Sequence, residues 1–143
     1  MYNRMAEETD YPVMVALWER SVRATHDFLA EPDLLALKKA MPDYFVDLDM
    51  KLWYDYDQIV GFSGTAEEKL EMLFVEPRHR QKGMGSKIIK QLIQEDGIHT
   101  VDVNTQNIAG LNFYLKQGFV VTGESPLDGQ GRPYPLTHLT LRK

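Results

Sequence analysis

The stretch Val75-Glu76-Pro77-Arg78-His79-Arg80-Gln81-Lys82-Gly83-Met84-Gly85-Ser86 carries the strongest structural signal in the chain. The apolar run over residues 70–75 predicts a strand leading into it, and the apolar spacing over residues 88–93 predicts a helix after it. Gly83 and Gly85 let the backbone turn sharply and approach a ligand closely between the two elements. Because the first N–H groups of a helix have no acceptor within it and lie at its positive end, this junction predicts a site for a diphosphate.

Positive charge is concentrated around this junction, although the chain as a whole is acidic. Five basic residues lie close together in the sequence: Arg78, Arg80, Lys82, Lys87 and Lys90. The chain carries 16 Lys and Arg against 21 Asp and Glu, which gives a net charge of −5 and a pI near 5.3. That balance gives no general attraction for nucleic acid and favours cationic partners, whereas the junction itself suits an anion.

Length and composition are those of an ordinary globular domain. The 143 residues, 43% hydrophobic and 26% charged, are expected to fold as one domain over residues 1–143. No apolar run is long enough to span a membrane, and residues 1–8 lack the apolar core of a secretion signal, so we expect a cytoplasmic protein. With no cysteine and no paired spacing among the four histidines, neither a disulfide nor a metal site is expected.

Hydrophobic periodicity outlines the other elements. A short strand over residues 1–5 precedes a helix that Thr9 caps and that ends near residue 24, and a second helix opens at Pro32 and is interrupted at Pro42. The later elements are strands at 52–56, 59–64 and 70–75, a helix at 83–96, a strand at 100–104, a helix from 107 to Gly118, and strands at 119–123 and 135–141. This order predicts a mixed α/β (α+β) fold in which the strands at 70–75 and 100–104 lie parallel.

Other glycine-containing site motifs fit the chain poorly. A dinucleotide-binding fingerprint needs a third glycine where the chain has Ile88, and no Walker A string is present. The string Gly61-Phe62-Ser63-Gly64-Thr65 departs from a nucleophile elbow at Thr65 and lies in a strand. On these residues alone, the Gly83 to Gly85 turn is either an anion site or a plain connection between strand and helix.

Two motifs resemble those of the GNAT superfamily of acyl-CoA-dependent N-acyltransferases. The family pattern Gln/Arg-x-x-Gly-x-Gly/Ala is filled by Arg80, Gly83 and Gly85. The run from Asn107 to Phe119 resembles the second family pattern, Asn-x-x-Ala/Gly-x-x-Phe-Tyr-x-x-x-Gly-Phe, and residues 21–29 and 131–136 resemble a bacterial branch, the YjaB type. The resemblance covers essentially the whole chain and implies a mostly antiparallel central sheet of six to seven strands flanked by about four helices.

The resemblance also implies acetyl-CoA as the cosubstrate. The residues assigned to it are Leu73, Phe74, Val75, Arg80, Gln81, Lys82, Gly83, Met84, Gly85, Ser86, Asn107 and Tyr114. The amides over residues 81–86 would hold the pyrophosphate, and a bulged strand over residues 73–75 would pair with the pantetheine and offer an N–H to the thioester carbonyl. The turn between the first two helices and the last hairpin would line the acceptor pocket, which nominates His26, Phe28 and His138.

Acyl transfer to an amine sets the requirements for the catalytic residues. The amine must lose a proton before it attacks, and the departing thiolate must gain one. Tyr114 is the expected acid, since a phenol has a pKa of about 10. Glu71 is the expected base, since strand alternation places it on an apolar face where partial burial would raise its pKa. His26 and His138 are alternative bases.

The sequence therefore predicts an N-acetyltransferase that moves an acetyl group directly from acetyl-CoA to a primary amine in a ternary complex, since no cysteine is present to hold an acetyl intermediate. A protein lysine, a protein N-terminus and a small-molecule amine are all possible acceptors. The alternative is a non-catalytic module that binds acyl-CoA as a sensor or partner. We expect a monomer or homodimer without nucleic-acid or membrane partners.

Overall fold

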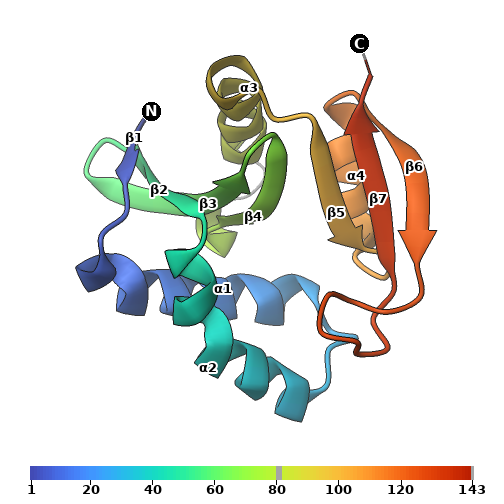
Figure 1. Cartoon of the computed structure of the whole chain (residues 1–143). Coiled ribbons are helices and arrows are strands. Elements are labelled where there is room, and N and C mark those ends of the chain that lie inside the picture. Colours follow the sequence, from blue (N-terminus) through green and yellow to red (C-terminus); the bar gives the residue numbers. More distant parts are fainter. Residues whose placement is uncertain (80–81, 143) are drawn as a thin grey trace.

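A single sheet of seven strands runs through the residues that the structure, a computed structural model, describes, namely 1–79 and 82–142 (Figure 1). The order across the sheet is β1 (Tyr2–Met5), β2 (Asp49–Asp55), β3 (Gln58–Ala66), β4 (Lys69–Val75), β5 (Thr100–Asn104), β7 (Leu136–Leu141) and β6 (Phe119–Ser125). All neighbours pair antiparallel except β4 and β5, which run parallel. The predicted mixed, mostly antiparallel sheet and its parallel pair are confirmed.

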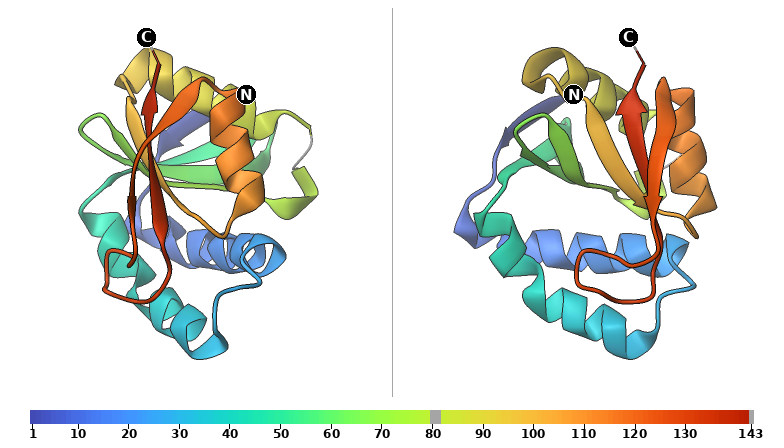
Figure 2. Two further views of the ribbon diagram at one scale, coloured as in Figure 1. Left: turned by 90° about the vertical axis from the view of Figure 1, so that its right-hand side faces the viewer. Right: turned by 45° about the vertical axis from the view of Figure 1, so that its right-hand side comes forward.

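Helices cover both faces of the sheet, as the views in Figure 2 show. In the described residues the α-helices are α1 (Tyr11–Thr25), α2 (Glu31–Val46), α3 (Met84–Asp96) and α4 (Ile108–Lys116). The core on the α1 and α2 side includes Met14, Leu17, Phe45, Leu52 and Phe62. The core on the α3 and α4 side includes Trp53, Leu70, Ile88, Leu92 and Phe119. Within these residues, no helix combines the length and apolarity needed to cross a bilayer.

β4 and β5 pair only where they begin, through Lys69 with Thr100 and Leu70 with Val101. Beyond that point β4 stays on β3, β5 stays on β7, and Figure 1 shows the two strands diverging. In a continuous sheet the facing edges would bond to each other. Here each edge presents backbone N–H and C=O groups to a gap, which makes it able to bind an extended ligand.

The pairing of β3 with β4 contains a bulge at Glu71, which has no partner on β3 between Leu70 and Met72. Strict alternation predicts that Leu70 and Met72 share a face, and the bulge makes this wrong. Leu70 packs in the core beneath α3, close to Leu73, whereas Met72 packs on the α1 and α2 side. The strand that carries residues 73–75 is therefore bulged, as expected, and the bulge lies at Glu71.

α2 runs unbroken through Pro42, where the sequence predicts an interruption. Proline removes one N–H and one hydrogen bond from the helix. Met41 and Phe45 are buried on either side of it, and their packing outweighs that local cost. The start of α1 also differs, because residues 8–10 form a separate 3-10 turn and Asp10, rather than Thr9, is the N-cap.

An ion pair between the exposed Arg20 and the buried Glu76 holds the end of β4, just before the 3-10 turn over Pro77–His79. Arg20 on α1 donates from Nε and Nη2 to the two carboxylate oxygens of Glu76 at 2.9 and 2.7 Å. Glu76 is 7% exposed, and the hydrogen bonds from Arg20 hold the pKa of its carboxyl below the usual value. The pair joins the end of β4 to α1, which packs on the face of the sheet opposite α3.

Replacing Glu76→Gln is expected to lower the free energy of unfolding by about 2 kcal/mol at neutral pH, a value moderated by the partial exposure of Arg20. Because the folded-state pKa lies below the ordinary value of 4.5, the wild-type advantage is fully present above that pH and shrinks as pH falls through the folded-state pKa. Urea titrations of both proteins from neutral to acidic pH measure this. A stability deficit that stays constant with pH would contradict it, and the exposed Glu95→Gln is the control.

Candidate active site

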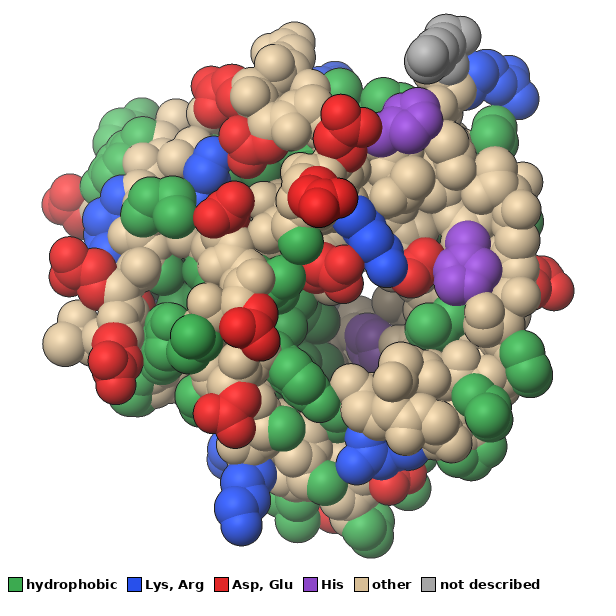
Figure 3. All heavy atoms as spheres, viewed as in Figure 1, with side chains coloured by type: hydrophobic (Ala, Val, Ile, Leu, Met, Phe, Trp, Pro, Cys, Tyr) green, Lys and Arg blue, Asp and Glu red, His purple; other side chains and the backbone are tan. Residues whose placement is uncertain are grey.

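A large cavity opens where β4 and β5 diverge. Its volume is about 820 Å³, and its lining comes from α1, α2, β4, β5, the start of α3, α4 and the loop between β6 and β7. Figure 3 shows the hollow on this face of the molecule, with acidic side chains and histidine around it. Segments far apart in the sequence therefore contribute to one site.

The start of α3 forms one end of this cavity, where residues 83–86 line it. Gly83 has φ +77°, a left-handed conformation that favours glycine. An intrahelical bond runs from the Lys87 N–H to the Gly83 carbonyl oxygen at 3.1 Å. The N–H groups that precede Lys87 in the helix have no intrahelical acceptor, so they are available to an anion at the positive end of α3.

Gly85 allows α4 to approach α3 closely, because a Cβ at this position would lie 3.2 Å from the ring of Phe113. Both glycines of the first motif therefore occupy positions with a steric or conformational reason for glycine. Lys82 is exposed beside the turn. Arg80 and Gln81, which the sequence also assigns to this site, lie outside the described residues.

The inner edge of β4 forms a wall of the cavity. The Glu76 N–H donates to the Val60 carbonyl oxygen on β3 at 2.7 Å. Since backbone groups of successive strand residues point to opposite sides, those of Phe74 point toward β3 and those of Leu73 and Val75 point toward the gap. The three residues predicted to meet the cofactor all line the cavity, with two of them offering unpaired backbone groups.

Asn107 caps α4 at the cavity wall, as predicted. Its Oδ1 accepts a hydrogen bond from the Gly110 N–H at 3.1 Å. A Cβ at Gly110 would lie 2.4 Å from Asn107 Nδ2, so the glycine of the second motif makes room for the capping side chain. Both residues line the cavity.

Tyr114 lies on α4, with its ring packed edge-on against Phe113 and Phe119 at centroid distances of 5.0 and 5.8 Å. It lines the cavity although only 8% of the residue is exposed. Burial raises the pKa of its phenol well above the ordinary value. The hydroxyl is therefore protonated at neutral pH and can donate a hydrogen bond to a group in the cavity.

A network of charged and polar side chains starts at the cavity rim, with Lys69, Glu71 and Asp102, and continues away from the cavity to His138 and Ser125. Lys69 Nζ lies 2.8 Å from one oxygen of Asp102 and 3.5 Å from Glu71 Oε1. His138 Nδ1 lies 2.6 Å from the other Asp102 oxygen, and its Nε2 lies 2.6 Å from Ser125 Oγ. Burial opposes ionisation of Asp102, but the hydrogen bonds from His138 and Lys69 lower the pKa of its carboxyl below the usual value.

The predicted partial burial of Glu71 is wrong. Glu71 is exposed at the rim, where the bulge leaves its backbone without a partner on β3 and its Oε1 lies 3.5 Å from Lys69 Nζ. His138, which the sequence nominates for the acceptor pocket, is not among the described residues that line the cavity. Asp102 does line it, and His138 contacts the site only through its hydrogen bond to Asp102. No cluster of three or more His, Asp or Glu side chains suited to a metal occurs in residues 1–79 and 82–142.

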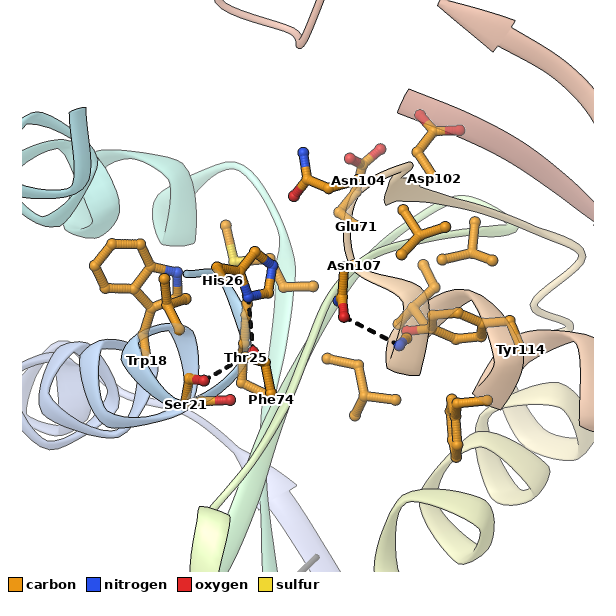
Figure 4. A pocket seen from close by; sticks show the side chains of 18 of the residues that line it. Trp18, Ser21, Thr25, His26, Glu71, Phe74, Asp102, Asn104, Asn107 and Tyr114 are labelled. Atoms are coloured by element: carbon orange, nitrogen blue, oxygen red, sulfur yellow. Dashed lines mark hydrogen bonds between the residues drawn. The ribbon is translucent and has the colours of Figure 1, made fainter. Parts of the chain in front are cut away.

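The end of α1 forms the wall opposite α4, and Figure 4 shows Thr25 and His26 across the cavity from Tyr114. The Thr25 hydroxyl donates to the Ser21 carbonyl oxygen at 2.9 Å and lies 2.7 Å from His26 Nδ1. With that hydroxyl hydrogen directed at Ser21, the Thr25 oxygen is left to accept a hydrogen bond from Nδ1 of His26. The ring of Phe28 lies 5.2 Å from His26, and both residues line the cavity.

Sequence reasoning missed Lys69 and Asp102. They lie on different strands with no shared motif, and only the parallel pairing of β4 with β5 brings them together. Tyr134 lies in residues 131–136, for which the sequence offers only a family resemblance, yet its hydroxyl donates a hydrogen bond to Asp33 in the first turn of α2. Pairings across this distance in sequence leave no local pattern that could reveal them.

Comparison with known families accounts for this arrangement. The family model of the acetyltransferase (GNAT) domain matches residues 24–134. The chain belongs to the GNAT family of acetyltransferases. The family resemblance of the two motifs is thereby confirmed, and with it the acyltransferase class.

This GNAT acetyltransferase is 37% identical over 129 residues to the peptidyl-lysine N-acetyltransferase YjaB of Salmonella typhimurium, with 88% of each chain covered. It matches the solution structure of apo YjaB from Escherichia coli with a TM-score of 0.87 and 33% identity, covering 97% of this chain and 95% of that one. PaiA N-acetyltransferase from Thermoplasma acidophilum, solved in complex with coenzyme A, has the same fold at 18% identity, with a TM-score of 0.72 and coverage of 99% and 98%.

Asn107→Ala is expected to lower the free energy of unfolding by about 1 kcal/mol, because the Gly110 N–H loses its acceptor. Asn107→Asp keeps an oxygen at the same place and is expected to retain most of the stability. Thermal unfolding of the three proteins measures the difference. Equal losses in the two variants would show that the side-chain cap is not what stabilises this helix.

Proposed function

We propose that this acetyltransferase transfers the acetyl group of acetyl-CoA directly to a lysine side-chain amine within a ternary complex. The observation that carries the proposal is the open edge of β4, which runs from the start of α3 to the wall that holds Tyr114. The activity named for the YjaB relative, peptidyl-lysine N-acetylation, supports lysine over the other amines. The glycine turn before α3 does not favour an ATP or NAD site, because these would need the Walker A string or the dinucleotide-binding fingerprint.

In this proposal acetyl-CoA lies along the gap between β4 and β5. Its diphosphate accepts hydrogen bonds from the first N–H groups of α3, at residues 83–86. Its pantetheine amides bond to the backbone of Leu73 and Val75 as an added strand would, with Asn107 beside it. A cavity of about 820 Å³ is large enough for the pantetheine arm and an acceptor together. The PaiA structure with coenzyme A supports this class of cofactor for the fold.

Acetyl-CoA at a hundredfold excess over its Kd is expected to raise the unfolding free energy by ~2.7 kcal/mol, whereas ATP and NADPH leave the melting temperature unchanged. Gly83→Ala should lose most of this shift, because a strained αL alanine moves the N–H groups that hold the diphosphate. Gly97→Ala is the matched control, since Gly97 also has a positive φ (+66°), has open space around it, and ends α3 away from the cavity. Equal ligand shifts in both variants would remove the diphosphate site from α3.

The acceptor amine approaches from the rim. A lysine amine with a pKa of ~10.4 is uncharged in only about one molecule in 2,500 at pH 7, which amounts to roughly 4.6 kcal/mol. Glu71 and Asp102 offer carboxylates that attract its ammonium group, against the single positive charge of Lys69. We assign to Glu71 the removal of the proton, through a water molecule because Glu71 is exposed at the rim.

The neutral amine then attacks the thioester carbon, and the oxyanion accepts a hydrogen bond from an N–H on the β4 edge. As the carbon–sulfur bond breaks, Tyr114 donates its hydroxyl proton to the sulfur and regains one from the nitrogen. Because burial raises the pKa of Tyr114, its hydroxyl carries a proton when the cofactor binds. Direct transfer needs no covalent acetyl-enzyme, which agrees with a chain that has no cysteine.

Thiol release with a lysine peptide is expected to be at least about tenfold slower in Tyr114→Phe, because the leaving sulfur loses its proton donor. The phenyl ring keeps the packing against Phe113 and Phe119, so acetyl-CoA binding should persist. Tyr11→Phe, which changes a tyrosine outside the cavity lining, is the control. Full activity of Tyr114→Phe over a wide pH range would overturn the assignment, and the absence of amine-dependent release in the wild type would favour an acyl-CoA sensor.

We also propose that residues 1–143 form one domain, because the two halves of the core lie on the two faces of a single sheet. The cytoplasmic location and the monomeric or homodimeric state stay predictions.

A further inference from the structure

The cavity has an apolar end as well as a charged rim. Away from the carboxylates of Glu71 and Asp102, its lining is made by apolar and aromatic side chains of α1, α2 and the turn between them: Trp18, Val22, Phe28, Leu29, Leu37 and Tyr44. The loop between β6 and β7 completes this end with Asp128, Gly129, Gln130 and Tyr134. These two segments are therefore placed to contact the part of the acceptor that carries the amine.

Hydrogen bonds join the two segments across the end of the cavity. The Tyr134 hydroxyl donates to Asp33 Oδ2 on the first turn of α2 at 2.5 Å, and it accepts from the Ala30 N–H at 3.1 Å. Arg132 Nε lies 3.4 Å from the other oxygen of Asp33. Tyr134 is only 8% exposed, its ring lies 6.2 Å from that of Phe28, and hydrogen bonding to Asp33 raises the pKa of its phenol. We call the pair of Tyr134 and Asp33 the latch.

The loop that carries Tyr134 is held in shape by its own hydrogen bonds. Asp128 Oδ1 accepts from the N–H groups of Gln130 and Arg132 at 3.0 and 2.8 Å, and the Asp128 N–H donates to the Arg132 carbonyl oxygen at 3.0 Å. Gln130 Nε2 also donates to the Tyr44 hydroxyl on α2 at 3.0 Å. A preformed loop that is tied to α2 at two points makes a wall of defined position.

We propose that the latch of Tyr134 and Asp33 is a specificity-determining pair that holds this wall against the apolar stem of the acceptor. The inference rests on the proposed lysine acetylation and deepens it. The acceptor is a primary ammonium on a flexible, unbranched apolar stem. Its methylene groups pack against Phe28, Leu29 and Tyr134 while its nitrogen lies toward the carboxylates of the rim. Tyr134 is a positioning residue, because it holds the wall and takes no part in the chemistry. Binding of acetyl-CoA at the start of α3 does not depend on it.

The test compares two acceptors and three variants in steady-state thiol release. The acceptors are Nα-acetyl-lysine amide, which has the stem, and glycinamide, which lacks it. Tyr134→Phe is expected to raise the KM for the lysine compound about tenfold, because a charge-assisted hydrogen bond is lost and the wall loosens. Asp33→Asn, which keeps an acceptor oxygen for Tyr134, should raise it about threefold. The KM for acetyl-CoA and the kcat/KM for glycinamide should stay within about twofold of wild type.

Tyr54→Phe is the matched control, since the Tyr54 hydroxyl also bonds to another side chain, Arg4, but lies outside the cavity lining. It should change neither KM, and melting curves with acetyl-CoA check that every variant is folded. An unchanged lysine KM in Tyr134→Phe overturns the latch while leaving the acetyltransferase proposal intact. Parallel losses with both acceptors and with acetyl-CoA also overturn it, because they indicate a general structural role. Wild-type protein that acetylates neither amine removes the proposed function itself, and the latch with it.

Discussion

The separation of β4 from β5 is the constraint on which the site depends. Two pairs of residues join the strands at their beginnings, and beyond them each strand is held from its other side, β4 by β3 and β5 by β7. The ion pair of Arg20 with Glu76 fixes the far end of β4, and the Asn107 cap fixes the start of α4 after β5. These separate supports hold the two strands apart beyond their first two pairs.

Charge is divided along the cavity in a way that suits two unlike ligands. The start of α3 presents N–H groups at the positive end of a helix, which suits a diphosphate. The rim presents Glu71 and Asp102, partly neutralised by Lys69, which suits an ammonium group. Between them Tyr114 is buried, and burial raises the pKa of its phenol, so the group that we propose as the proton donor to the sulfur carries no charge of its own at neutral pH. This division of charge is what the proposed ternary complex of an anionic cofactor and a cationic acceptor requires of an acidic protein.

Elements that end at residues with strong local preferences were predicted closely from the sequence. α3 lies between Gly83 and Gly97, both with positive φ, and Asn107 begins α4 by capping it. The predictions that were wrong concern features that depend on contacts with other elements of the fold. α2 continues through Pro42 because residues beside it are buried by other elements. The bulge at Glu71 arises where β4 pairs with β3, and the sequence of β4 alone does not reveal it.

By itself, the sequence determined the order of helices and strands, the glycine turn before α3, the cap of α4 and the membership of a family, because each rests on residues adjacent along the chain. Tertiary structure decided how the rim and the far wall are built. Lys69 meets Asp102 only through the parallel pairing of β4 with β5, and Tyr134 meets Asp33 across a separation of 101 residues. Contacts of that kind follow from how the sheet and helix layers close on one another, and packing geometry is not written in any local stretch of the chain.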